Sequence, residues 1–196
     1  MSKKRVAVLI SGSGSNLQAL IDAASHADYP AEIAVVISNT DDAYGLERAR
    51  QADIRTEVLR HNSYPTREAY DAALHEILLN YNTEVVCLAG FMRILSAAFV
   101  EKWSGKMLNI HPSLLPAYRG LHTHERALAD GATEAGCTVH YVVPELDAGP
   151  HILQAKVPVL PKDTPETLAA RVLEQEHRIY PEALRQHCVQ SVAHRP

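Results

Sequence analysis

The sequence predicts an α/β protein with a doubly wound, mostly parallel sheet, to which an antiparallel strand pair and a long helix are added near the C-terminal end. Three observations support this class. Short apolar runs alternate with longer helical patterns from Val6 to Asn109, a glycine-serine turn follows the first apolar run, and the last third holds two apolar runs with no room for a helix between them.

The parallel part consists of five expected strands and the helices that connect them. Val6 to Ile10 is an apolar run typical of a strand that is covered on both faces. Further strands are expected at 33–37, 56–59, 85–88 and 106–108, and helices from Asn16 onward and at 46–51, 67–79 and 97–102. Strands that alternate with helices imply right-handed crossovers and therefore parallel pairing.

The C-terminal third predicts a different pairing. Residues 137–143 and 152–159 are joined by a short segment rich in proline and glycine, which favours antiparallel strands. Asp163 to Glu166 combines a polar cap with Pro165 in the first turn, a strong helix start. We expect this helix to reach about Arg178, to be kinked or restarted by Pro181, and to be followed by a frayed tail over 189–196.

Composition limits the class of protein. A chain of 196 residues with 46% hydrophobic content can bury one core, so a single domain is expected over 1–196. A net charge of −4 argues against a nucleic-acid partner. Cys87, Cys137 and Cys188 form no CxxC pair, which fits a reducing compartment, and no apolar run is long enough for a membrane span. We expect a cytoplasmic protein without a membrane partner.

The glycine-serine turn Ser11 to Asn16 lies between the first strand and the first helix, where backbone N–H groups and a helix N-terminus can bind phosphate. It lacks the GK[ST] of a P-loop, and Leu17 replaces the third glycine of the dinucleotide fingerprint. A monophosphate is therefore favoured over a pyrophosphate. The alternative is a turn in which Ser15 or Asn16 only caps the helix.

The segment Asn109 to Pro116 and the later Asp147 to Pro150 carry the chemistry. We expect the strand to end before Asn109, so that Asn109 and His111 are exposed on a proline-bounded turn. An asparagine can donate to a developing oxyanion, a histidine can move a proton, and Asp147 can keep that histidine protonated, which indicates acyl-type transfer.

Two other chemistries fit poorly. Ser113 lies in no GxSxG elbow, which argues against a serine hydrolase. His122 and His124 alternate without a carboxylate cluster, so no metal is expected, and these histidines are expected to pack or hydrogen-bond near a helix start.

Five motifs, taken in order, resemble the phosphoribosylglycinamide formyltransferase family of purine biosynthesis. The motifs are Ser11 to Asn16, Ala89 to Leu95, Asn109 to Pro116, Asp147 to Pro150 and Glu174 to Pro181, and the resemblance covers nearly the whole chain. It implies a Rossmann-like formyltransferase fold and transfer of the formyl group of 10-formyltetrahydrofolate to the glycine amine of glycinamide ribonucleotide (GAR), with Asn109, His111 and Asp147 as catalytic residues.

The resemblance also assigns binding residues. Those implied for GAR are Gly14, Ser15, Asn16, Leu173, Glu174, Gln175 and Glu176, with the phosphate at the glycine turn and the ribose at Glu176. Those implied for the folate are Arg67, Met92, Arg93, Ile94, Leu95, Asn109, Val143, Pro144, Glu145, Leu146 and Asp147. Residues 1–105 would form a nucleotide-binding half and 106–196 a folate-binding and catalytic half. A homodimer is plausible.

Three alternatives stay open. A methionyl-tRNA formyltransferase or a formyltetrahydrofolate hydrolase would share the Asn109, His111 and Asp147 core, although each normally carries an additional domain for which this chain has no space. A non-enzymatic nucleotide-binding module would explain the glycine turn and leave the catalytic trio without a role.

Overall fold

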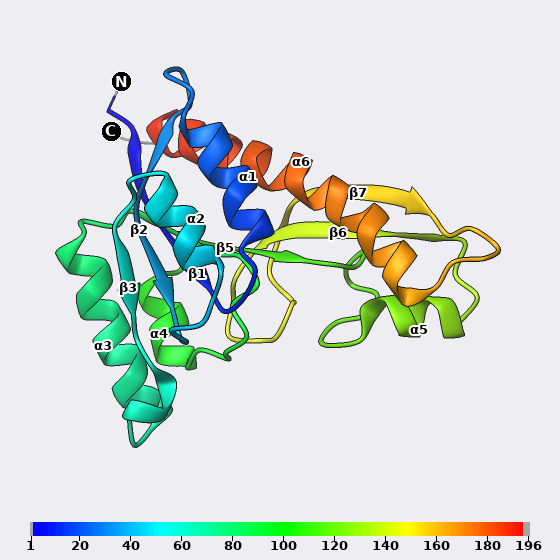
Figure 1. The fold of residues 1–196 in the computed structure, drawn as a ribbon, viewed down its shortest axis with the longest axis horizontal. Coiled ribbons are helices and arrows are strands. Elements are labelled where there is room, and N and C mark those ends of the chain that lie inside the picture. The colour runs from blue at the N-terminus through cyan, green and yellow to red at the C-terminus, as the bar shows by residue number, and fades with distance from the viewer. Residues whose placement is uncertain (1, 194–196) are drawn as a thin grey trace.

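A seven-stranded sheet in the order β3-β2-β1-β4-β5-β6-β7 forms the centre of the molecule (Figure 1). The computed structural model describes the backbone of residues 2–193 and the side chains of residues 2–190. The strands are β1 (Lys4–Ile10), β2 (Ala31–Ser38), β3 (Thr56–Val58), β4 (Val85–Leu88), β5 (Met107–His111), β6 (Glu134–Tyr141) and β7 (His151–Pro158). The first five pair in parallel, and β6 is antiparallel to both β5 and β7, which confirms the predicted class.

Helices cover both faces of the parallel part. One face carries α1 (Ser15–Ala24), α2 (Gly45–Gln51) and α6 (Pro165–Ala193), with α5 (Thr123–Ala129) beside α6, and the other carries α3 (Arg67–Asn80) and α4 (Ala97–Lys102). A 3₁₀ turn at His61–Ser63 precedes α3. Alternate residues of β1 enter the two cores: Val6, Val8 and Ile10 pack toward α1 and α6, and Ala7 and Leu9 toward α3.

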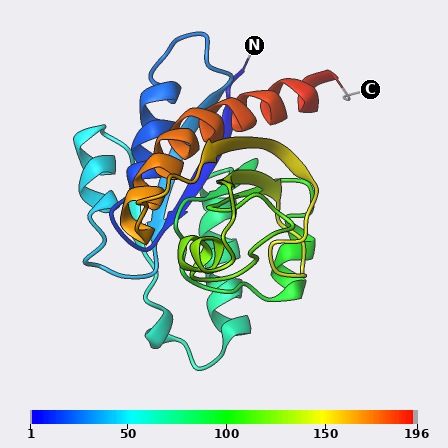
Figure 2. The same cartoon turned by 90° about the vertical axis from the view of Figure 1, so that its right-hand side faces the viewer.

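The helix α6 is longer than expected. It continues through Pro181 to Ala193, so the expected break and most of the expected frayed tail are wrong, and residues 194–196 lie outside the described residues. Tyr180, Ala183 and Leu184 on either side of the proline are buried in the core, and this packing outweighs the single backbone hydrogen bond that proline removes. Figure 2 shows α6 as one continuous helix. Of the described helices, none is both long and apolar enough to cross a membrane.

The strand β5 also differs from expectation. It does not end before Asn109 but includes Asn109 and runs to His111, which is only 6% exposed. The antiparallel partner β6 continues the hydrogen-bonded ladder past Asn109, which is why polar residues remain in the sheet. A helix start was expected near His122 and His124, where α5 begins, but the extent of α5 was not predicted, and the 3₁₀ turn was not predicted at all.

The order of strands predicts a crevice at the carboxyl ends of β1 and β4. The chain winds outward from β1 through β2 to β3 and then returns to β4 on the other side of β1. In such sheets the loops at the carboxyl ends of the two central strands separate and leave room for a ligand. The glycine turn follows β1, and the Met92 segment follows β4. The topology thus brings two of the predicted sites to one edge.

Candidate active site

Three polar side chains occupy one face of the sheet at its centre. Asn109 and His111 are two positions apart on β5, and His140 of β6 is paired directly with Asn109. The intervening Leu108 and Ile110 belong to the core on the α6 side, so the polar trio faces the opposite side. The Asn109 Nδ2 lies 3.3 Å from His140 Nε2.

Asp147 comes to these residues from the turn between β6 and β7. Its carboxylate lies between the two imidazoles: Oδ2 is 3.5 Å from His111 Nδ1, and Oδ1 is 3.8 Å from His140 Nε2. The turn requires glycine two residues later, because a Cβ on Gly149 would overlap the carbonyl oxygen of Tyr141. The steric fit of Gly149 therefore helps to set the position of the aspartate.

His111 has an acceptor at each ring nitrogen. Its Nε2 donates to the carbonyl oxygen of Tyr118 at 2.9 Å, and its Nδ1 faces Asp147. Asp147 Oδ2 also accepts the Gly120 N–H at 2.9 Å. An imidazolium, which carries hydrogen on both nitrogens, could donate to both of these acceptors. The structure thus brings Asn109, His111 and Asp147 together, as the sequence predicts.

The segment after β5 is held against the sheet by hydrogen bonds. Leu115 N donates to Thr138 Oγ1 at 3.1 Å, Thr138 Oγ1 donates to the Ser113 carbonyl at 2.7 Å, and Gln154 Nε2 donates to the Leu115 carbonyl at 2.9 Å. Ser113 Oγ donates to Ala117 O and does not contact His111. Its hydroxyl is a structural element of the turn.

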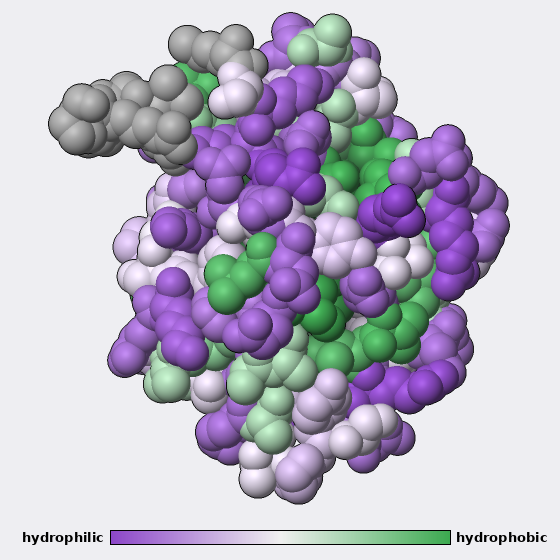
Figure 3. Space-filling view, turned by 90° about the vertical axis from the view of Figure 1, so that its left-hand side faces the viewer, coloured by the Kyte–Doolittle hydropathy of each residue, from purple (hydrophilic) through white to green (hydrophobic). Residues whose placement is uncertain are grey.

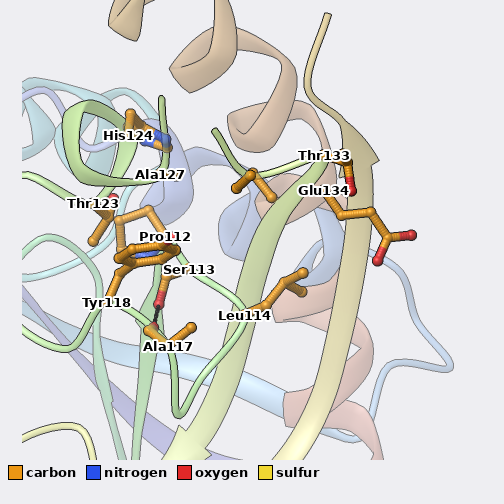
Figure 4. A pocket seen from close by; sticks show the side chains of 12 residues that line it. Pro112, Ser113, Leu114, Ala117, Tyr118, Thr123, His124, Ala127, Thr133 and Glu134 are labelled. Carbon is orange, nitrogen blue, oxygen red and sulfur yellow. Dashed lines mark hydrogen bonds between the residues drawn. The ribbon is translucent and has the colours of Figure 1, made fainter. Parts of the chain in front are cut away.

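A cavity of about 320 Å³ lies behind this segment. In Figure 4, Thr123, His124 and Tyr118 stand on one side of it, and Thr133 and Glu134 on the other. Burial lowers the pKa of His124, whereas His122 is exposed at the start of α5, 3.7 Å from Glu125. The two histidines therefore do not share a site.

The glycine turn has the geometry of an anion site. Gly14 precedes α1 in the left-handed conformation, with φ of 73°, and a Cβ there would lie 2.6 Å from the Gly45 Cα. No side chain caps α1, so the alternative in which Ser15 or Asn16 serves as a helix cap is wrong. The free N–H groups of the first turn remain available to a ligand.

Asn16 instead joins the two ends of the chain. Its Nδ2 donates to Glu176 Oε2 of α6 at 2.7 Å, although the residues are 160 positions apart. Asn16 is 9% exposed, and its Oδ1 has no partner within the described residues. Burial raises the pKa of Glu176, and the hydrogen bond from Asn16 lowers it in part. Leu173, Glu174 and Gln175 precede Glu176 on α6, and Glu174 is exposed.

Sequence reasoning missed two basic residues beside this turn. A cavity of about 430 Å³ is lined by Ser15, Gln18, Ala19, Asp22, Arg48 and His177. Arg48 of α2 donates through Nε to the Ser13 carbonyl at 2.8 Å, and His177 Nε2 is buried without a partner among the described residues. Burial and then Arg48 lower the pKa of His177. Arg48 lies in no motif, and His177 lies in the Glu174 to Pro181 motif without an assigned role; the helix packing brings the two residues together.

The segment after β4 is tied to the end of β1. Met92 N donates to Ser11 Oγ at 2.8 Å, and Ser11 Oγ donates to Asn39 Oδ1 at 2.6 Å. Met92 is 69% exposed and Ile94 61%, whereas Leu95 enters the core. The sites after β1 and β4 are thereby coupled by one hydroxyl.

The other residues assigned to the folate surround this segment unevenly. The guanidinium of Arg93 lies 4.5 Å from the ring centroid of Tyr70. Arg67 is exposed at the start of α3, and Pro144, Glu145 and Leu146 are exposed while Val143 is half-buried. No hydrogen bond joins Arg67 to these residues in the described part of the chain.

Taken together, the site offers donors for a developing oxyanion, a carboxylate that can hold a proton, and a separate place for an anion. His140 is a further member that sequence reasoning missed, since it sits in an apolar strand without a motif. Within the described residues, no group of three or more His, Cys, Asp or Glu side chains could hold a metal ion. The three cysteines are unpaired and buried.

Comparison with known proteins gives a consistent picture. Residues 4–184 match the family model described as formyl transferase. The chain is 57% identical over 177 residues to the phosphoribosylglycinamide formyltransferase of Escherichia coli K12, covering 90% of this chain and 83% of that protein.

Longer relatives and a solved structure also match. The chain is 56% identical to part of the trifunctional purine biosynthetic protein adenosine-3 of Bos taurus, covering 93% of this chain but only 18% of that protein. It therefore spans less than a fifth of the length of this relative. The crystal structure of glycinamide ribonucleotide transformylase 1 from Symbiobacterium toebii superimposes with a TM-score of 0.94 at 50% identity, covering 96% of this chain and 89% of that one.

Proposed function

The chain belongs to the formyl transferase family, and from this membership and the geometry of the site we propose that it transfers a formyl group from 10-formyltetrahydrofolate to the amine of GAR. The E. coli relative, which is 57% identical over 177 residues, is named for formyl transfer to the same acceptor. The chain is thus a phosphoribosylglycinamide formyltransferase that acts in purine biosynthesis.

The ribonucleotide would bind along α1 and α6. The free N–H groups after Gly14 and the guanidinium of Arg48 offer a positive environment for the phosphate. Glu176 would accept hydrogen bonds from the ribose hydroxyls, and the unpartnered Asn16 Oδ1 can accept another. Leu173 to Gln175 would line the same side. Two hydrogen-bond acceptors for the hydroxyls and a cation for the phosphate suit a sugar phosphate.

The folate would bind beside Met92 to Leu95. Exposed Met92 and Ile94 would provide apolar contacts, as would the half-buried Val143 and the exposed Pro144 to Leu146. Arg67 and Arg93 would attract the anionic part. Asn109 and Asp147 would touch the formyl-bearing end.

The proposed chemistry follows from the charges and hydrogen-bonding groups of Asn109, His111 and Asp147. The amine attacks the formyl carbon, and the oxygen gains negative charge. An Asn109 N–H and the His111 imidazolium would stabilise that charge, for which the oxygen would replace the Tyr118 carbonyl at His111 Nε2. Asp147 would keep His111 protonated and, directly or through a water, accept the proton that the amine loses. The same proton would pass to the folate nitrogen as the bond between that nitrogen and the formyl carbon breaks.

The observation that carries the proposal is the meeting of Asn109, His111 and Asp147 at β5, next to β4, whose following Met92 segment is hydrogen-bonded to Ser11 at the end of β1. An assay that follows loss of 10-formyltetrahydrofolate with and without GAR tests it. We expect loss only when GAR is present. Loss without GAR would indicate a hydrolase, and no loss with GAR would indicate a nucleotide-binding module.

Organisation and location complete the proposal. We propose one domain over 1–196, with a nucleotide-binding half at 1–105 and a folate-binding and catalytic half at 106–196. We further propose a cytoplasmic enzyme, with neither nucleic acid nor membrane as a partner, that can form a homodimer. On the face shown in Figure 3, groups of hydrophobic residues are separated by hydrophilic ones. That face is one candidate for such an interface, which sedimentation would test.

A further inference from the structure

We propose that His140 is a positioning residue that acts as a neutral hydrogen-bond acceptor and fixes the orientation of the Asn109 amide, a role that rests on the proposed function. His140 is 2% exposed and carries no charge partner closer than the 3.8 Å to Asp147. Its place opposite Asn109 in the β5–β6 ladder makes it the direct cross-strand neighbour of a residue that would contact the formyl oxygen.

The hydrogen bonds of His140 allow only one arrangement of protons in the neutral ring. Its Nδ1 lies 3.0 Å from the carbonyl oxygen of Tyr141, an acceptor, so Nδ1 must carry the hydrogen. In the neutral imidazole, Nε2 is then a bare acceptor. The Asn109 atom 3.3 Å away must therefore be the donating Nδ2 and not Oδ1. One ring thus selects one of the two possible amide orientations.

The surroundings favour the neutral ring. Burial lowers the pKa of His140, and His111 and His151 act in the same direction, while the Tyr141 carbonyl and Asp147 oppose them. Of the two histidines, His111 is nearer to Asp147, at 3.5 Å. Both ring nitrogens of His111 face acceptors. One carboxylate therefore lies between two histidines, and its shorter contact is with His111.

The orientation of the Asn109 amide decides where its donor and its acceptor are available to the substrates. With one N–H of Asn109 donated to His140, the second N–H and Oδ1 remain, and neither has a partner within the described residues. The N–H can donate to the formyl oxyanion, and Oδ1 can accept from the attacking amine. Without His140 the amide can rotate by half a turn, which exchanges donor and acceptor. Misorientation of a catalytic group costs about 10²-fold in rate.

A double-mutant cycle tests this dependence. We expect His140→Leu to lower kcat about 10²-fold with KM values for both substrates nearly unchanged. His140→Gln, whose Oε1 can accept from Asn109, should recover most of kcat. In an Asn109→Ala background, His140→Leu should cost little more. His26→Gln, at an exposed histidine just after α1, is the matched control and should leave kcat unaltered.

Equal losses in the wild-type and Asn109→Ala backgrounds would overturn the proposal, as would a His140→Gln variant no better than His140→Leu. Nitrogen-15 NMR of histidine-labelled protein gives a second readout that needs no turnover. We expect His140 as the neutral Nδ1–H tautomer at pH 7, and an imidazolium or an Nε2–H tautomer would refute the proposal. Absence of formyl transfer by the wild type would instead refute the proposed function and leave the NMR result to decide the role of the ring.

Discussion

Replacement of Asp147 by asparagine should lower turnover while ribonucleotide binding stays near normal. The substitution removes one negative charge but keeps an oxygen that can accept the Gly120 N–H, so the turn is retained. His111 loses the carboxylate that faces its Nδ1, so no negative charge at that position stabilises an imidazolium. The formyl oxyanion would then meet a neutral ring in place of a cation.

The magnitude follows from the distance. Two unit charges 3.5 Å apart attract each other by about 4.7 kcal/mol at an effective dielectric constant of about 20, which sets the upper limit of the loss. Removal of one oxyanion donor costs about 10²–10³ in rate, or about 2.7–4 kcal/mol. We therefore expect kcat to fall by about 10²–10³, because the amide still offers a weak dipole to His111.

The assay is steady-state formyl transfer with both substrates, together with calorimetric titration of GAR. Binding of GAR should change little, since Asn16 and Glu176 do not contact Asp147. The control is Glu134→Gln, which removes an exposed carboxylate that pairs only with Lys156 on the neighbouring strand. Unaltered turnover of Asp147→Asn, or an equal loss in the control, would refute the reasoning.

Three further substitutions test other parts of the structure. Arg48→Met should raise KM for GAR by about 10–100-fold with kcat nearly unchanged, because a charged hydrogen bond to phosphate is lost, whereas Arg50→Met on the same helix should have no effect. Because burial raises the pKa of Glu176 above 4.5, its contribution to stability is complete below pH 4.5 and is lost as the pH rises through the raised value. In urea unfolding, the free energy of unfolding of Glu176→Gln should therefore rise relative to wild type as the pH increases, and a difference that does not change with pH would contradict this. Leu74→Ala, at a fully buried position of α3, should cost about 2–5 kcal/mol in urea unfolding, whereas Leu79→Ala, at an exposed position of the same helix, should cost less than about 0.5 kcal/mol.

Most of the sheet could be predicted because its strands are apolar runs of the right length. Val85 to Leu88 was expected and is found with those bounds. The end of β5 was not, since polar Asn109 and His111 before Pro112 resemble a strand end. Only the ladder with β6, which is invisible in the local sequence, keeps them in the sheet.

The site shows the same division. Asn109, His111 and Asp147 lie in segments with proline and glycine, and that local signal suffices to select them. His140 has no such signal, because its function depends on strand register and on which residue lies opposite. Arg48 is similar: it reaches the proposed anion site only because α2 packs beside the glycine turn.

The hydrogen bond between Asn16 and Glu176 bears on the order in which the protein forms. These residues are 160 positions apart, so the proposed ribonucleotide site forms only after the whole sheet has been synthesised and α6 has docked across it. Contacts of such long sequence separation slow folding, because the loop entropy is lost before the contact forms. A nascent chain that lacks α6 could build the early strands, yet it would hold an incomplete nucleotide site. We expect substrate affinity to be the last native property that the emerging polypeptide acquires.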